Sequence, residues 1–200
     1  DSFNTRKDWY MTWAQIREIA TYGHGIEIGN HSKGHGPGLG PMTDLENEFL
    51  ANGVPLPTSI IWPLYQADLA STPTWLAKGY TFARGGGGGH EYPYDPTVDH
   101  PLDLPAWTLN GASSGASTFD TFVGWVQRAV KGKIVVICIH GVPDMEHPSV
   151  GTDPLVFTQC VEYLKANNYK VISMHDIGQY VDAVKAATVL PLPASTPDIT

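Results

Sequence analysis

Two histidines in a glycine-rich stretch are the residues of this chain best placed to do chemistry. His31 and His35 stand four positions apart in the segment 30–36, directly after the apolar residues Ile26 and Ile28. Neutral imidazoles are good ligands for zinc and its neighbours among the divalent metals, so both rings could turn toward one ion. The spacing alone fits two solvated loop histidines equally well, because the chain contains 8 histidines.

Other polar or rigid residues also stand where a predicted strand ends. The four residues that follow apolar, strand-like runs are His31, Pro63, Arg84 and His140. In folds built on parallel strands, ligands gather at the carboxyl ends of the strands. We therefore expect these four residues to lie near one another. For His140 alone, a histidine that caps a strand through a backbone hydrogen bond is the simpler alternative.

Helices and strands are predicted to alternate along the chain. Capping boxes at Thr12–Gln15 and Thr43–Glu46 mark two helix starts, and Pro73 and Pro154 mark two more. Apolar periodicity and glycine stops complete the pattern. Helices are expected at 12–23, 43–53, 72–79, 118–132, from 153 onward and at 177–184, and strands at 25–30, 59–62, 80–83, 134–139 and 170–173.

Three segments carry more specific expectations. The run 134–139 is apolar at every position, which is typical of a strand covered on both faces of a parallel sheet. The five glycines 85–89 predict a loop, because glycine loses the most backbone entropy on ordering. The segment 90–110 is rich in proline, aspartate and aromatic residues, and we expect it to cross the surface.

The alternation predicts an α/β fold with a parallel sheet, either open or rolled into a barrel. A chain of 200 residues with 42% hydrophobic residues can bury one sizeable core, so we expect one domain over 1–190 and a proline-rich tail over 191–200. Cys138 and Cys160 fall in a predicted strand and a predicted helix, where a free thiol behaves as a small apolar group.

The charge of the chain excludes some partners. The formal net charge is -8, with 12 Lys+Arg and no basic block, which argues against a nucleic-acid surface. No apolar run reaches the roughly 20 residues of a membrane span, and the first residues lack the pattern of a signal peptide. A neutral or cationic substrate fits this balance better.

Taken together, five motifs resemble the polysaccharide deacetylases of carbohydrate esterase family four, the NodB-like family. The resemblance runs in the family's order from about Tyr10 to Val181, and His-Ser-x-x-His is its most specific element. The motifs are Met11-Thr12-Trp13-Ala14-Gln15, Gly29-Asn30-His31-Ser32 with His35, Trp62-Pro63-Leu64-Tyr65, Gly79-Tyr80 to Arg84, and Ile139-His140-Gly141.

This resemblance implies a distorted (β/α) barrel and the removal of acetyl groups from N- or O-acetylated glycans with a divalent metal. Zinc is the expected metal, with cobalt, nickel and manganese as alternatives, and a secreted or periplasmic location is favoured. By the same resemblance His31 and His35 would be metal ligands and His140 the general acid. The backbone NH of Tyr65 would help to hold the oxyanion. The family's arginine at the start of this motif is absent here, and Arg84 could replace it in binding substrate. From their residue type, Trp62 and Tyr65 could bind substrate by stacking on a sugar ring.

One departure from the family's pattern is serious. The family's first motif, two adjacent aspartates that supply the catalytic base and the third metal ligand, does not occur in this sequence. The chain enters the pattern close to Thr12, so the barrel would be incomplete and an uncovered sheet edge would favour self-association. Substitute carboxylates could come from Asp1, Asp144, Glu146 or Asp153.

Three functions therefore stay open. The first is a metal-dependent deacetylase that acts on an acetylated glycan or a small acetylated substrate. The second is a relative that binds carbohydrate without turnover, because the aspartate base is gone. The third is a piece of a larger enzyme, completed by the first motif or by a neighbouring copy in a homo-oligomer.

Overall fold

The computed structural model describes residues 7–22, 26–86, 89–110 and 117–190, and the predicted proline-rich tail lies outside this part. Its helices are α2 (Trp13–Tyr22), α3 (Leu39–Ala51), α4 (Thr72–Ala77), α5 (Phe119–Val126), α6 (Pro154–Ala166) and α7 (Ala183–Val189). Its strands are β1 (Ser59–Ile61), β2 (Phe82–Arg84), β3 (Trp107–Thr108) and β4 (Ile137–Cys138). None of the described helices is long and apolar enough to cross a membrane.

The strands form two parallel pairs. In the first pair Ser59 of β1 lies opposite Phe82 of β2, and in the second Trp107 of β3 lies opposite Ile137 of β4. Arg84 also bridges to Leu104 in parallel, which brings the two pairs close together. Parallel pairing agrees with the expectation from the sequence. The described residues form these short sheets without a closed barrel.

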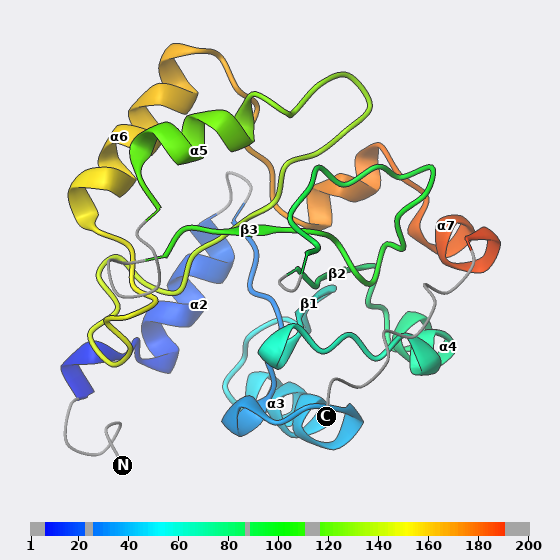
Figure 1. Ribbon diagram of the computed structural model, residues 1–200. Helices are drawn as coiled ribbons and strands as arrows, with labels where there is room; N and C mark the ends of the chain where they lie inside the picture. The colour runs from blue at the N-terminus through cyan, green and yellow to red at the C-terminus, as the bar shows by residue number, and fades with distance from the viewer. Residues whose placement is uncertain (1–6, 23–25, 87–88, 111–116, 191–200) are drawn as a thin grey trace, which may run out of the picture.

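Helices cover the two pairs at opposite ends of the molecule (Figure 1). Helices α3 and α4 pack on β1 and β2 through a core that includes Met42, Ile60 and Trp75. Helices α5 and α6 lie side by side and pack Phe122 and Cys160 toward β3 and β4. The free cysteines Cys138 and Cys160 are half-buried and buried, as expected.

Local capping explains where several helices begin. The Thr12 hydroxyl accepts the NH of Gln15 at 3.3 Å, and the Gln15 side chain accepts the NH of Thr12 at 2.7 Å, which confirms the first capping box. Asp153 accepts the NH groups of Leu155 and Val156 at 2.8 and 3.1 Å, which confirms the predicted start of α6.

The second predicted capping box is wrong. Helix α3 begins at Leu39, so Thr43 and Glu46 lie inside it. Pro41 falls in the first turn, where its missing NH costs no hydrogen bond. The Glu46 carboxylate instead pairs with Lys78 at 2.6 Å and accepts the Tyr80 hydroxyl at 2.7 Å. Contacts distant in sequence therefore replace the expected cap.

The expectation that 90–110 crosses the surface is also wrong. Tyr94, Leu102 and Leu104 are each 0% exposed, and β3 lies in this segment. The predicted strand 134–139 is shorter than expected, because β4 contains only Ile137 and Cys138. Both residues are half-buried, although full cover was expected. Residues 170–173, and 26–29 before Asn30, form no strand.

Trp75 should be a main source of stability. Its ring is 0% exposed and lies 5.4 Å from that of Trp62 and 5.9 Å from that of Tyr80, centroid to centroid. We expect Trp75→Ala to lower the free energy of unfolding by about 3 to 5 kcal/mol. Leu50→Ala, at a side chain 60% exposed, should change it by less than about 0.5 kcal/mol. Urea unfolding measures both, and equal losses would contradict this account.

Candidate functional site

The buried amide of Asn30 holds the histidine loop in place. Asn30 is 0% exposed and continues the sheet as a bridge to Ile60. Its Nδ2 donates to the Met42 carbonyl at 3.1 Å and to the Tyr80 hydroxyl at 2.7 Å, while its Oδ1 accepts the NH of Ser32 at 2.8 Å. The residue before His31 is therefore fixed on three sides.

The structure brings the two predicted ligand histidines together. The ring centroids of His31 and His35 lie 4.8 Å apart at an interplanar angle of 74°. The Nδ1 of His31 lies 2.8 Å from the Ile61 carbonyl oxygen, a bond that requires the proton on Nδ1 and leaves Nε2 as an acceptor. A carbonyl partner of this kind is typical of metal-binding histidines.

Backbone strain concentrates in the two loops at this site. Ser32 and His35 have φ angles of 66° and 59°, and Leu64 and Tyr65 have φ angles of 55° and 61°. Among the described residues, only Asn168 is a further non-glycine residue with positive φ. Such conformations persist where surrounding structure imposes them, and they cluster at functional sites.

Arg84 joins the site from the end of β2. It is 7% exposed, its Nη1 donates to the Gly85 carbonyl at 3.1 Å, and its guanidinium lies 4.8 Å from the centroid of the Tyr65 ring. The Tyr65 hydroxyl lies 3.1 Å from Oγ1 of Thr108, which is the last residue of β3. The Tyr65 NH, however, donates to the Trp62 carbonyl at 3.2 Å and is not free for the oxyanion role that the resemblance implied.

Trp62 lies elsewhere than expected. Its ring is 1% exposed, packs on Trp75 and donates from Nε1 to the Leu102 carbonyl at 2.7 Å. It belongs to the core beneath Pro63, so the expectation that it stacks on a sugar is not met. Of the predicted substrate residues, Tyr65 and Arg84 lie at the site.

His140 completes the cluster, and the charges around it are mainly positive. Burial is the main cause that lowers the pKa of His31. The guanidinium of Arg84 and the neighbouring rings of His35 and His140 lower it further, while the bond to the Ile61 carbonyl raises it. His140 is exposed by area, yet partial shielding from water and the charge of Arg84 lower its pKa, with Asp144 acting in the opposite direction. His31 and His140 are therefore mainly neutral at pH 7.

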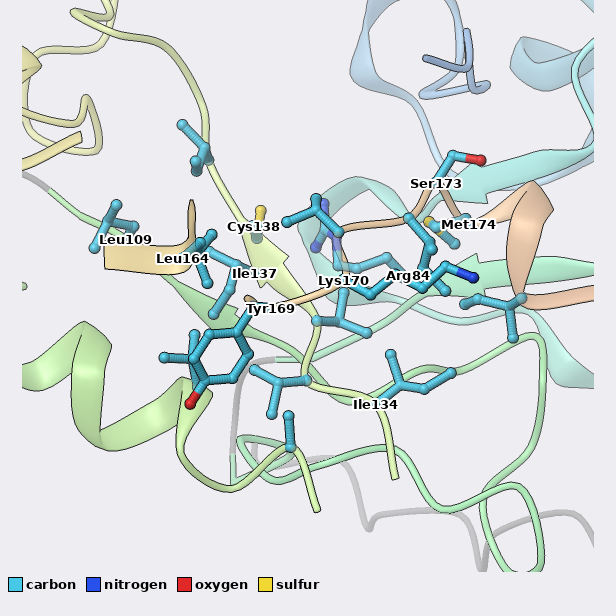
Figure 2. Close-up of a pocket in the computed structure, with 18 of the residues that line it drawn as sticks. Arg84, Leu109, Ile134, Ile137, Cys138, Leu164, Tyr169, Lys170, Ser173 and Met174 are labelled. Atoms are coloured by element: carbon cyan, nitrogen blue, oxygen red, sulfur yellow. The ribbon is translucent and has the colours of Figure 1, made fainter. Parts of the chain in front are cut away.

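These residues open onto a large apolar cavity of about 1360 Å³. His31, Arg84 and His140 line one part of it, and the rest comes mainly from the run 134–139, helices α5 and α6, and residues 169–174. Figure 2 shows Arg84 on the side of Met174, with Leu164 and Tyr169 on the opposite side. The expected cover on both faces of 134–139 is replaced on one side by this cavity.

The candidate substitute carboxylates have different surroundings. Asp153 caps α6, and Glu146 accepts a hydrogen bond from the Tyr10 hydroxyl. Asp144 lies close enough to His140 to favour its protonated form. Asp1 lies outside the described residues. Of the three that are described, Asp144 is the one with an electrostatic effect on a predicted site residue.

The residues present fit part of a metal centre. His31 and His35 supply two imidazoles, and the Ser32 hydroxyl beside them is buried without a hydrogen-bond partner in the described part of the chain, as a group near a missing ligand would be. Within the same part, no group of three or more His, Cys, Asp or Glu side chains is arranged to hold a metal ion. The third donor must come from elsewhere or from water.

Asp103 is a residue near the site that sequence reasoning missed. A Cβ atom at Gly85 would lie only 1.8 Å from Oδ1 of Asp103, so the glycine after Arg84 is needed for close packing. Burial raises the pKa of the Asp103 carboxyl. In the sequence, the glycine that directly follows Arg84 was the available signal for a close neighbour at this position.

The chain matches no protein-family model, and a search of curated proteins also found no match.

The lowered pKa of His31 predicts a pH dependence of stability. Below the reference pKa of 6.5, the unfolded chain takes up a proton at this residue more readily than the folded protein does. Stability should therefore fall as the pH drops through that range. We expect His31→Asn to lose less stability than the wild type between pH 7.5 and about 5, as measured by urea unfolding with chelator present. Equal losses in both proteins would contradict the lowered pKa.

Proposed function

We propose that this protein is a metal-dependent hydrolase that removes acetyl groups from an acetylated glycan. The observation that carries the proposal is the convergence of His31, Arg84 and His140 at one end of a cavity, with the ring of His35 against that of His31, in the order and spacing of the motifs. Residues from three distant parts of the sequence contribute to this cluster.

His31 and His35 would hold the metal. The Ile61 carbonyl fixes the ring of His31 so that Nε2 is the ligand atom. When bound, a divalent metal polarises an acyl carbonyl and lowers the pKa of a water ligand. Neutral imidazoles are required for this task, and burial favours the neutral form of His31 at pH 7.

His140 would give a proton to the leaving amine or alcohol. Because Arg84 and partial burial favour the neutral ring while Asp144 favours the protonated one, His140 would first take up the proton that the attacking water loses and then pass it to the leaving group. Arg84 places a fixed positive charge near both histidines, where it would stabilise the negative charge that develops on the acyl oxygen.

A second candidate function is carbohydrate binding without turnover. It is favoured by one observation, namely that the described residues provide no third metal ligand. The positive surroundings of His31 would attract a carboxylate from another segment or another copy, and such a group would complete the centre. Metal content and acetate release separate these candidates.

The decisive test combines metal analysis with acetate release from acetylated oligosaccharides. The wild type should bind about one zinc ion and release acetate, and chelation should abolish the release. His35→Ala should lose the zinc, whereas His140→Ala should keep it and lose about 10²- to 10⁴-fold in kcat. His175→Ala, at an exposed histidine far from the cluster in sequence, is the control. A metal-free wild type that still binds glycan would support the binding function instead.

A further inference from the structure

A second, smaller pocket lies on the other side of His140. Its volume is about 250 Å³, and His140 is the one residue that it shares with the lining of the large cavity. Its wall includes Trp9, Tyr10, Asp144 and Glu146. His140 therefore stands between an apolar space and a space lined by aromatic rings and carboxylates.

The loop 141–152, which forms most of this pocket, has a fixed shape. Its two ends meet where the NH of Thr152 donates to the Gly141 carbonyl at 2.8 Å, and the Thr152 hydroxyl anchors them to the Leu109 carbonyl at 2.7 Å. Inside the loop, Oδ1 of Asp144 accepts the NH groups of Glu146 and His147 at 3.0 and 2.7 Å.

Two glycines allow this loop to close around Asp144. A Cβ atom at Gly141 would lie 2.9 Å from the Cα of Asp144, and one at Gly151 would lie 2.8 Å from its backbone nitrogen. Asp144 is thus enclosed, and its side chain is 15% exposed. The pocket next to His140 is pre-formed, which lowers the entropic cost of binding.

The residue types in the pocket fit one sugar ring. Aromatic rings offer a flat apolar surface with little conformational freedom to lose, and carboxylates accept hydrogen bonds from hydroxyl groups. The Tyr10 hydroxyl donates to the Glu146 carboxylate, which orients both groups. The volume of 250 Å³ is slightly below the roughly 300 to 1000 Å³ of pockets for drug-sized ligands.

We propose that this pocket binds the sugar that carries the acyl group, on the leaving-group side of His140. The inference rests on the proposed function, because a general acid must contact the leaving atom and the sugar follows directly from that atom. The acyl group then points toward the large cavity. Trp9 and Tyr10 bind substrate, although they lie far from the histidine motifs in sequence.

The test uses two substrates with sugars and one without. The wild type is compared with Trp9→Ala and Tyr10→Phe. Binding of acetylated chitotetraose and acetylated xylotetraose is measured by intrinsic fluorescence and calorimetry. Acetate release is measured with the same oligosaccharides and with 4-nitrophenyl acetate. Trp9→Ala should weaken oligosaccharide binding and raise KM about 3- to 10-fold, with 4-nitrophenyl acetate turnover unchanged. Tyr22→Ala, at an aromatic residue 66% exposed on α2, is the matched control.

Each outcome decides a different point. An equal loss of turnover with 4-nitrophenyl acetate would show a structural role for Trp9 and overturn the proposal. Oligosaccharide binding that is unchanged in both variants would also overturn the proposal. The same holds if the wild type binds neither oligosaccharide. If no acetyl substrate is cleaved but Trp9→Ala still weakens oligosaccharide binding, the hydrolase function fails while the sugar pocket stands. Tyr10→Phe keeps the ring and decides the question if Trp9→Ala does not fold.

Discussion

The hydrogen bonds of the Asn30 side chain are the constraint on which the geometry of the site depends. This one buried amide connects the loop of His31 to α3 through the Met42 carbonyl and to the start of β2 through Tyr80. Tyr80 in turn donates to Glu46, which pairs with Lys78. Because buried polar groups are costly to leave unpaired, the network permits one position of the loop and fixes the direction in which His31 leaves the sheet.

The site contains the permanent positive charge of Arg84 within a chain that is acidic as a whole. The formal net charge is -8, yet His31 is surrounded by His35, Arg84 and His140. Of the described acidic residues, Asp144 is the one whose charge favours the protonated form of either His31 or His140, and it does so for His140. Such surroundings favour neutral imidazoles and an anionic ligand, and both are conditions that acyl transfer at a metal centre requires.

Sequence reasoning succeeded where the signal was local. Helix starts at Thr12 and Asp153 depend on side chains within three residues, and both were predicted correctly. The convergence of His31, Arg84 and His140 followed from the rule on strand ends, although β4 is much shorter than the apolar run suggested.

Prediction failed where distant contacts decide the structure. The pattern around Thr43 resembles a cap, but the Glu46 carboxylate pairs with Lys78 and accepts the Tyr80 hydroxyl. Local sequence rules do not reveal these two distant partners. Proline and aspartate in 90–110 suggested a surface path, yet Leu102 and Leu104 fill the core between the two strand pairs. The burial of Trp62 likewise depends on Trp75 and on the Leu102 carbonyl, which are remote in sequence.

The large cavity has a consequence for the motions of the molecule. This cavity is only partly enclosed by its lining residues, so solvent enters it. Water then reaches the inner wall of α5 and α6 and the edge of β4 that faces away from β3. Local opening should be easiest in this half of the molecule, and deuterium should enter the backbone of 134–139 sooner than that of β1 and β2.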